Sequence, residues 1–149
     1  MRGRKVLETV RLSSTDIRDP CTIAVLGGVI YAIVIHSWFL SSGVYFSNQG
    51  TAAVVLAFLY SLVGMFAMAA VPLYLFGRLS LVSAPLATLW VLGNTVSQWL
   101  YGAHPHPRSS YLTVWPMLLG CVLAITLGEA LLRVGLDRTV GRFGLRPAF

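Results

Sequence analysis

Charged residues are scarce in this chain, and four long stretches have almost none. Charged residues make up 11% of the 149 residues, whereas apolar residues make up 56%. Four long stretches contain no Lys, Arg or Asp: residues 20–40, 51–76, 79–101 and 111–132. About a quarter of the residues in an ordinary soluble domain are charged. The composition therefore excludes a soluble domain of the usual kind.

Other absences exclude particular activities. The cysteines, Cys21 and Cys121, stand in different stretches with no C-x-x-C between them, which argues against a thiol-disulfide oxidoreductase. The single lysine, Lys5, lies outside the four stretches, so a retinal has no attachment point within them. The chain also lacks a P-loop, a G-x-G-x-x-G and a G-x-S-x-G motif. These absences favour a protein that is not an enzyme and holds no cofactor.

The apolar stretches are long enough to cross a bilayer. A hydrocarbon core about 30 Å thick needs roughly 20 apolar residues at about 1.5 Å of rise each. We therefore predict an all-α, polytopic membrane protein with four transmembrane helices in one bundle, a single domain over residues 1–149. The first stretch exceeds the roughly 7 to 15 apolar residues of a cleavable signal. We expect it to be retained as a span.

Basic residues are distributed unequally about the four stretches. Of the 11 Lys and Arg residues, one side has only Arg108, and the other side has the rest: Arg2, Arg4, Lys5, Arg11, Arg18, Arg78, Arg133, Arg138, Arg142 and Arg146. Cytoplasmic flanks are enriched in Lys and Arg. We therefore predict cytoplasmic termini, a location in the cell membrane, and basic tails (residues 1–19 and 133–149) that contact anionic lipid headgroups. Because orientation accounts for the net charge, we expect no nucleic-acid partner.

Small residues recur at helical spacing in every stretch. In lipid, helices associate where such residues let their backbones approach. The residues are Ala24, Gly28 and Ala32; Ala53, Ala57, Ser61 and Gly64; Ser83 and Ala87; and Gly120, Ala124 and Gly128. Four such faces predict a tight bundle, with any surplus face contacting other subunits or a second copy. Pro72 and Pro85 predict kinks near the turn at residues 77–80, through packing alone or as part of a substrate pathway.

Three histidines map to the outer side of the predicted topology. His36 continues the small-residue face of the first stretch, while His104 and His106 follow the third stretch in a His-Pro-His-Pro run. Imidazole nitrogens suit zinc or copper, so the three together are a candidate metal site. No fourth ligand is evident. The alternative is that the loop histidines are solvated and His36 bonds a neighbouring side chain.

Two carboxamides and one carboxylate complete the polar groups of interest. Asn94 and Gln98 lie four residues apart at a depth similar to that of His36, which predicts either hydrogen bonds between helices or a pocket for a small polar ligand. Glu129 precedes Arg133 by four residues, a spacing that predicts an ion pair near the membrane surface. A proton relay through Glu129 would need a second acid or base within the stretches.

The leading hypothesis for function is a non-enzymatic structural or accessory subunit of a membrane complex. The first alternative is a small transporter or ligand-binding bundle that uses the outer-side polar pocket of His36, Asn94 and Gln98. The second alternative is the outer-side metal site of His36, His104 and His106. The small-residue faces favour the leading hypothesis, a subunit of a complex, because there are more of them than one isolated bundle requires.

Overall fold

The computed structural model describes residues 19–41, 50–102 and 107–140. Within these ranges the chain forms five α-helices and no strand. The helices are α2 (Pro20–Ser41), α3 (Thr51–Leu79), α4 (Ser83–Tyr101), α5 (Pro107–Thr113) and α6 (Trp115–Val140). Three of them, α2, α3 and α6, are long and apolar enough to cross a membrane. Within these ranges the structure thus confirms the prediction of an all-helical protein, with three helices that could cross a membrane.

The third predicted crossing, α4, has a different composition. It contains 19 residues, yet it is not among the helices apolar enough to be membrane-spanning candidates. Asn94, Ser97 and Gln98 account for this, because they lower the hydropathy of its second half. The crossing by α4 stays a prediction.

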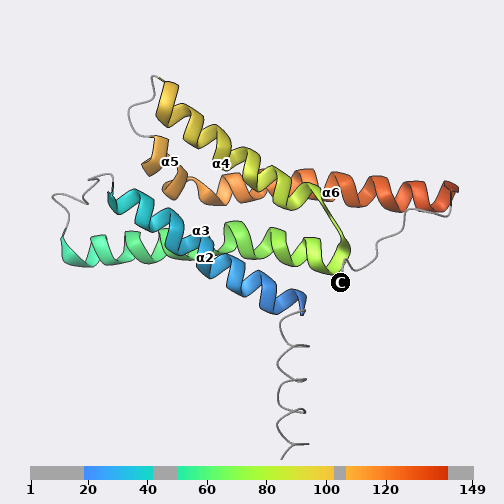
Figure 1. Cartoon of the computed structure of the whole chain (residues 1–149), viewed down its shortest axis with the longest axis horizontal. Helices are drawn as coiled ribbons and strands as arrows, with labels where there is room; N and C mark the ends of the chain where they lie inside the picture. The colour runs from blue at the N-terminus through green and yellow to red at the C-terminus, as the bar shows by residue number, and fades with distance from the viewer. Residues whose placement is uncertain (1–18, 42–49, 103–106, 141–149) are drawn as a thin grey trace, which may run out of the picture.

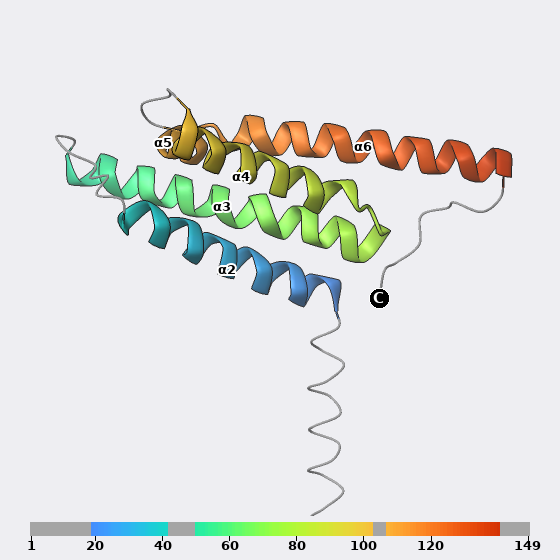
Figure 2. The same cartoon turned by 45° about the horizontal axis from the view of Figure 1, so that its top comes forward.

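The long helices run back and forth along one direction (Figure 1). Figure 2 shows α3 between α2 on one side and α4 and α6 on the other, and α3 packs against all three. The start of α2, the turn from α3 to α4 and the end of α6 therefore lie toward the same end of the bundle (Figure 1). Met65 and Met68 of α3 and Val122 of α6 are completely buried in the core.

The turn between α3 and α4 lies later in the chain than predicted. Helix α3 continues to Leu79 and ends where Ser80 adopts a left-handed conformation, with φ of 55°. The Ser80 N–H donates to the Phe76 carbonyl oxygen at 2.8 Å, which satisfies one of the free carbonyls at the helix end. Consequently α4 begins at Ser83, not at residue 79.

The fourth predicted stretch is not one helix. A bend at Val114 divides it into α5 and α6, so the prediction of a continuous helix over residues 111–132 is wrong at its start. Pro116 gives the physical reason: it has no N–H to donate, and its ring would clash with the carbonyl of Leu112 in an unbroken helix. At the other end α6 continues to Val140 and extends past the other helices (Figure 2).

The small-residue faces are used unequally. The predicted face of α2 is buried, and a Cβ atom on Gly28 would lie 2.8 Å from the Phe66 ring and 2.9 Å from the Ala70 methyl group. On α6, by contrast, a Cβ atom on Gly120 or Gly128 would meet nothing within 4 Å. The small residues of α6 therefore do not pack inside the described part of the bundle, and α6 carries the surplus face.

The two prolines near the α3–α4 turn have different roles. Pro72 is buried within α3, which continues through it, whereas Pro85 is the third residue of α4. In the first turn of a helix the N–H has no partner in that helix, so Pro85 costs no hydrogen bond. The predicted kink at Pro85 is therefore wrong. Both prolines nevertheless line one apolar groove of about 320 Å³ between α2, α3 and α4.

Candidate functional sites

His36 is buried between α2 and α3, and both of its ring nitrogens have partners. Nδ1 lies 2.8 Å from the carbonyl oxygen of Ala32, to which it can only donate, and Nε2 lies 3.0 Å from Ser61 Oγ. The imidazole and the Phe58 ring also form an edge-to-face pair, with centroids 5.2 Å apart. The Ser61 hydroxyl has two acceptors in reach, because the Phe58 carbonyl oxygen lies 2.9 Å away. His36 is therefore a hydrogen-bonded link between two helices.

The candidate metal site of His36, His104 and His106 stays a prediction. His104 and His106 lie outside the described residues. Among residues 19–41, 50–102 and 107–140, no three His, Cys, Asp or Glu side chains are grouped to hold a metal ion. A metal at Nε2 of His36 would also have to displace Ser61.

Asn94 and Gln98 lie at a separate place from His36. Together with Thr95, Ser110 and Tyr111 they line a hollow of about 150 Å³ between α4 and the α5–α6 bend. His36 bonds Ser61 on α3 and does not line this hollow, so the hollow contains two of the three residues of the predicted pocket, and the pocket with all three stays a prediction. Asn94 and Gln98 are both exposed. They are exposed because the rotation of α4 about its axis places both residues at the edge of the face that packs against the bundle.

A second polar contact lies beside this hollow. The Tyr31 and Tyr111 hydroxyl oxygens are 2.5 Å apart, which joins α2 to α5 across 80 positions in the sequence. Tyr111 is buried. Thr95, which also lines the hollow, donates within its own helix to the Val91 carbonyl oxygen at 3.0 Å. Sequence reasoning missed the tyrosine pair because it placed Tyr111 at the start of a straight span.

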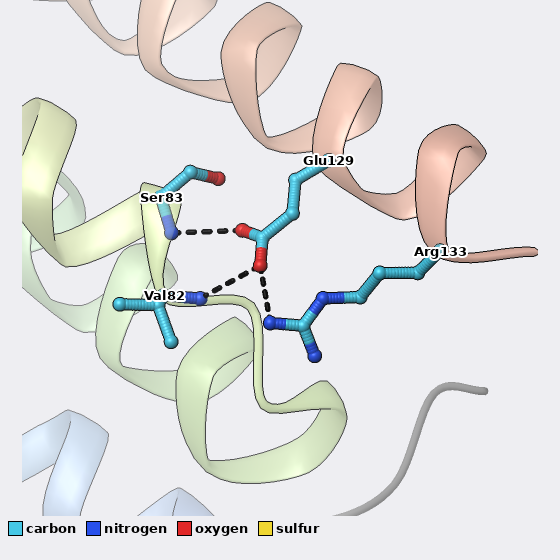
Figure 3. Close-up of polar contacts among 4 residues, drawn as sticks. All are labelled: Val82, Ser83, Glu129 and Arg133. Carbon is cyan, nitrogen blue, oxygen red and sulfur yellow. Dashed lines mark hydrogen bonds and ion pairs between the residues drawn. The ribbon is translucent and has the colours of Figure 1, made fainter. Parts of the chain in front are cut away.

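Glu129 connects α6 to the beginning of α4 (Figure 3). Its carboxylate accepts a hydrogen bond from the Ser83 backbone N–H at 2.8 Å and another from the Val82 N–H at 3.3 Å. Arg133, one turn further along α6, forms an ion pair with the same carboxylate. The glutamate therefore has two kinds of partner, and the sequence pointed to only one of them.

The position of Glu129 follows from what α4 lacks. Helix α4 has no acidic residue in its first turn and no side-chain cap of its own. The first N–H groups of a helix are unpaired and carry partial positive charge, so they favour an anion. Glu129 supplies this anion from the neighbouring helix α6. The signal was available in the sequence: the predicted topology brought Glu129 and an uncapped helix start to the same cytoplasmic depth.

An aromatic residue closes the joint between α5 and α6. The Trp115 indole covers Gly64 of α3, where a Cβ atom would lie 2.3 Å from the ring. Tyr60 lies beside the indole, with ring centroids 5.5 Å apart, and its hydroxyl donates to the Thr113 carbonyl oxygen at 3.0 Å. Gly64 therefore makes room for the ring that anchors the start of α6.

Comparisons with protein-family models, with curated proteins and with solved structures found no match.

Proposed function

We propose that the chain crosses the cell membrane four times, with α4 as the third crossing and both termini in the cytoplasm. The 19 residues of α4 span about 28 Å, close to the roughly 30 Å of a hydrocarbon core. Arg78 at the end of α3 and Arg133 and Arg138 on α6 lie toward the same end of the bundle as the start of α2. The positive-inside rule favours this end as cytoplasmic.

Within this membrane, the proposed role is that of a non-enzymatic subunit of a larger complex. The observation that carries the proposal is the exposure of α6. Of its described side chains only Val122 and Thr126 are buried, and its glycines at 120 and 128 face open space. Lipid tails are as apolar as leucine, so small residues gain nothing from facing lipid but allow another helix to approach closely. The exposed face of α6 can therefore accept a further helix packed against the bundle.

The experiment is to extract the affinity-tagged full-length chain from its native membrane in a mild detergent and to record its native mass spectrum. The proposal expects masses above that of the 16.2 kDa chain, from a partner or from further copies. Detection of the monomer alone, across several mild detergents, would remove the basis of the proposal. A crosslinking step before extraction preserves complexes that the detergent would otherwise dissociate.

A second candidate function is the binding of a small polar molecule in the hollow of Asn94 and Gln98. Two carboxamides can donate and accept hydrogen bonds at once, which suits a hydroxyl or carbonyl group. The matched experiment compares small molecules that co-purify with the wild-type chain and with Gln98→Leu, by solvent extraction and mass spectrometry. A compound held by the wild type and lost from the variant would favour this candidate over a purely structural role.

The proposed partners also include lipid. Arg138 is exposed near the end of α6, and Arg142 and Arg146, which continue its spacing, lie outside the described residues. Each Arg close to an anionic membrane surface contributes about 1 kcal/mol. We propose that this basic tail contacts anionic headgroups of the cytoplasmic leaflet.

A further inference from the structure

The hydroxyl groups of Tyr31 and Tyr111 share one hydrogen bond and leave one proton without an acceptor. Their oxygens lie 2.5 Å apart, and either atom could be the donor. Each phenol has one proton to donate, so the tyrosine that accepts in the pair still has a proton of its own. Neither hydroxyl has a further hydrogen-bond partner among the described residues. A buried donor without an acceptor is unfavourable, so an acceptor from outside the chain would stabilise the pair.

The two tyrosines border different spaces. Tyr31 lines the apolar groove between α2, α3 and α4, where the hydroxyl of Thr88 bonds a carbonyl oxygen of its own helix. Tyr111 lines the hollow between α4 and the α5–α6 bend, which also contains Asn94 and Gln98. A hydroxyl proton is more favourable beside the polar hollow than beside the apolar groove. This favours Tyr31 as the donor within the pair and leaves the Tyr111 proton available to the hollow.

The hollow offers hydrogen bonds but no charge. Among the described residues, the carboxamides of Asn94 and Gln98 have no hydrogen-bond partner. None of the residues that line the hollow is charged. An ionic headgroup would therefore find no opposite charge there, whereas a carbonyl oxygen can accept a hydrogen bond from Tyr111 and from either carboxamide. The volume of about 150 Å³ equals that of about five water molecules, which is enough for a small ring or an ester group.

The depth of the hollow indicates a ligand from the lipid phase. With α4 as a crossing, as proposed above, Asn94 and Gln98 lie about 16 to 23 Å along the helix from Ser83. This places them within a hydrocarbon core about 30 Å thick. Val114 and Leu118 line the same hollow with apolar side chains, and Val114 is exposed. An apolar tail can therefore extend from the hollow over Val114 into the lipid.

We propose that the hollow binds the neutral carbonyl headgroup of a membrane-soluble amphiphile, with Tyr111 as a hydrogen-bond donor and the carboxamides of Asn94 and Gln98 as further partners. This rests on the second candidate function, the binding of a small polar molecule in this hollow, and specifies the ligand class and the donor. Two kinds of membrane molecule have such a group: a quinone with an apolar tail, and an uncharged acylglycerol. Their shared chemistry is a carbonyl oxygen on an apolar body.

Titration of the purified full-length chain in detergent micelles tests the ligand class. The probes are decylubiquinone and monodecanoylglycerol, and binding is followed by calorimetry. Decylbenzene, which has a similar tail but no carbonyl group, is the control. We expect saturable binding of at least one carbonyl probe and none of decylbenzene, and the probe that binds more tightly identifies the source. Binding of decylbenzene with equal affinity, or saturable binding of no probe, would overturn the proposal.

Two matched tyrosine variants separate binding from packing. Tyr31→Phe and Tyr111→Phe each remove the hydrogen bond between α2 and α5, so both are expected to lower the thermal stability by similar amounts. Only Tyr111→Phe removes the donor to the hollow, and it is expected to raise the dissociation constant of the probe roughly 2- to 13-fold, the range for one hydrogen bond between neutral groups. Tyr31→Phe is expected to leave this constant unchanged, because Tyr111 keeps its proton. Equal losses of affinity in the two variants would overturn the role of Tyr111 as donor.

A further variant tests the apolar groove as the alternative place of binding. Leu89 lines the groove and is exposed, so Leu89→Trp narrows the groove and leaves the hollow intact. We expect it to bind the probe as the wild type does, and we expect Gln98→Leu to bind it more weakly. Loss of binding in Leu89→Trp, with full binding in Gln98→Leu, would place the ligand in the groove and overturn the proposal.

The outcomes separate this inference from the second candidate function. A co-purifying compound that is lost from Gln98→Leu, but that is charged or has no carbonyl group, would overturn the inference and leave that function standing. If neither carbonyl probe binds and no compound co-purifies with the wild type, both are overturned. A co-purifying quinone or acylglycerol that is lost from Gln98→Leu and depleted in Tyr111→Phe, but retained by Tyr31→Phe, would support both.

Discussion

Glu129 of α6 accepts a 2.8 Å hydrogen bond from the backbone N–H of Ser83, the first residue of α4. The contact joins positions 46 residues apart. A carboxylate in an apolar stretch costs free energy on insertion into a membrane, yet here it neutralises the positive end of a neighbouring helix. Glu129, the one acid of the predicted spans, thus links α6 to the start of α4. Arg133 of α6 forms an ion pair with the same carboxylate.

The first prediction concerns this tie. Glu129→Ala removes both the helix cap and the ion pair, so we expect it to lower the free energy of unfolding by about 1 to 2 kcal/mol. Arg133→Ala removes only the pair between i and i+4 and is expected to cost about 0.3 to 0.5 kcal/mol. Both are measured by reversible unfolding in detergent micelles.

Glu129→Gln serves as the control, since it retains an acceptor for the Ser83 N–H but loses the charge. Its cost should fall between those of the two alanine variants. If Arg133→Ala were as harmful as Glu129→Ala, the ion pair and not the cap would be the main contribution, and the interpretation of the site would have to change.

The sequence predicted the features that depend on local pattern, such as the positions of helices. It did not predict the features that depend on how each helix is rotated about its own axis. The run of apolar residues was enough to predict α2 and α3 closely, because a membrane allows little besides helices. Pro116 was an available signal for the bend before α6, but the apolar content of the stretch concealed it. The sequence could also predict that His36 faces inward, since it continues the Ala24, Gly28 and Ala32 face.

The partners of the polar groups were not predictable in the same way. The sequence predicts that Asn94 and Gln98 share a depth with His36, but depth does not fix which way a helix turns about its own axis. Packing of Ala84, Ala87 and Val91 sets that rotation and leaves both amides at the edge. His36 found its partner in Ser61, a residue that the sequence marked only as small.

The second prediction compares two glycines. Gly28→Ala is expected to destabilise the bundle by about 1 to 3 kcal/mol, because its new methyl group would overlap Phe66 and Ala70. Gly120→Ala adds the same group where nothing lies within 4 Å, and its better helix propensity is expected to stabilise the monomer by up to about 1 kcal/mol. Unfolding in micelles, at concentrations where the chain is monomeric, gives both values. A cost for Gly120→Ala equal to that of Gly28→Ala would contradict the observed packing.

The third prediction concerns the link between α2 and α3. Ser61→Ala leaves Nε2 of His36 without its partner at a buried position, so we expect a loss of about 0.6 to 1.7 kcal/mol, the range for hydrogen bonds between membrane helices. Thr126→Ala is a suitable control, because Thr126 is equally buried but bonds only the Val122 carbonyl oxygen in its own helix. An unchanged stability for Ser61→Ala would mean that His36 is satisfied elsewhere.

The fourth prediction tests the orientation on which every inside and outside assignment depends. Ser80 lies in the turn between α3 and α4 and Ser41 ends α2, so the two residues lie at opposite ends of the bundle. In a Cys21→Ala/Cys121→Ala background, Ser41→Cys is expected to react with a membrane-impermeant maleimide on intact cells. Ser80→Cys is expected to react only after the membrane is made permeable. The reverse pattern would invert the topology, and labelling of both on intact cells would exclude an odd number of crossings between the two positions. Because α3 is the one helix that the structure describes between Ser41 and Ser80, the result is independent of whether α4 crosses the membrane, and it therefore separates the orientation from the count of spans.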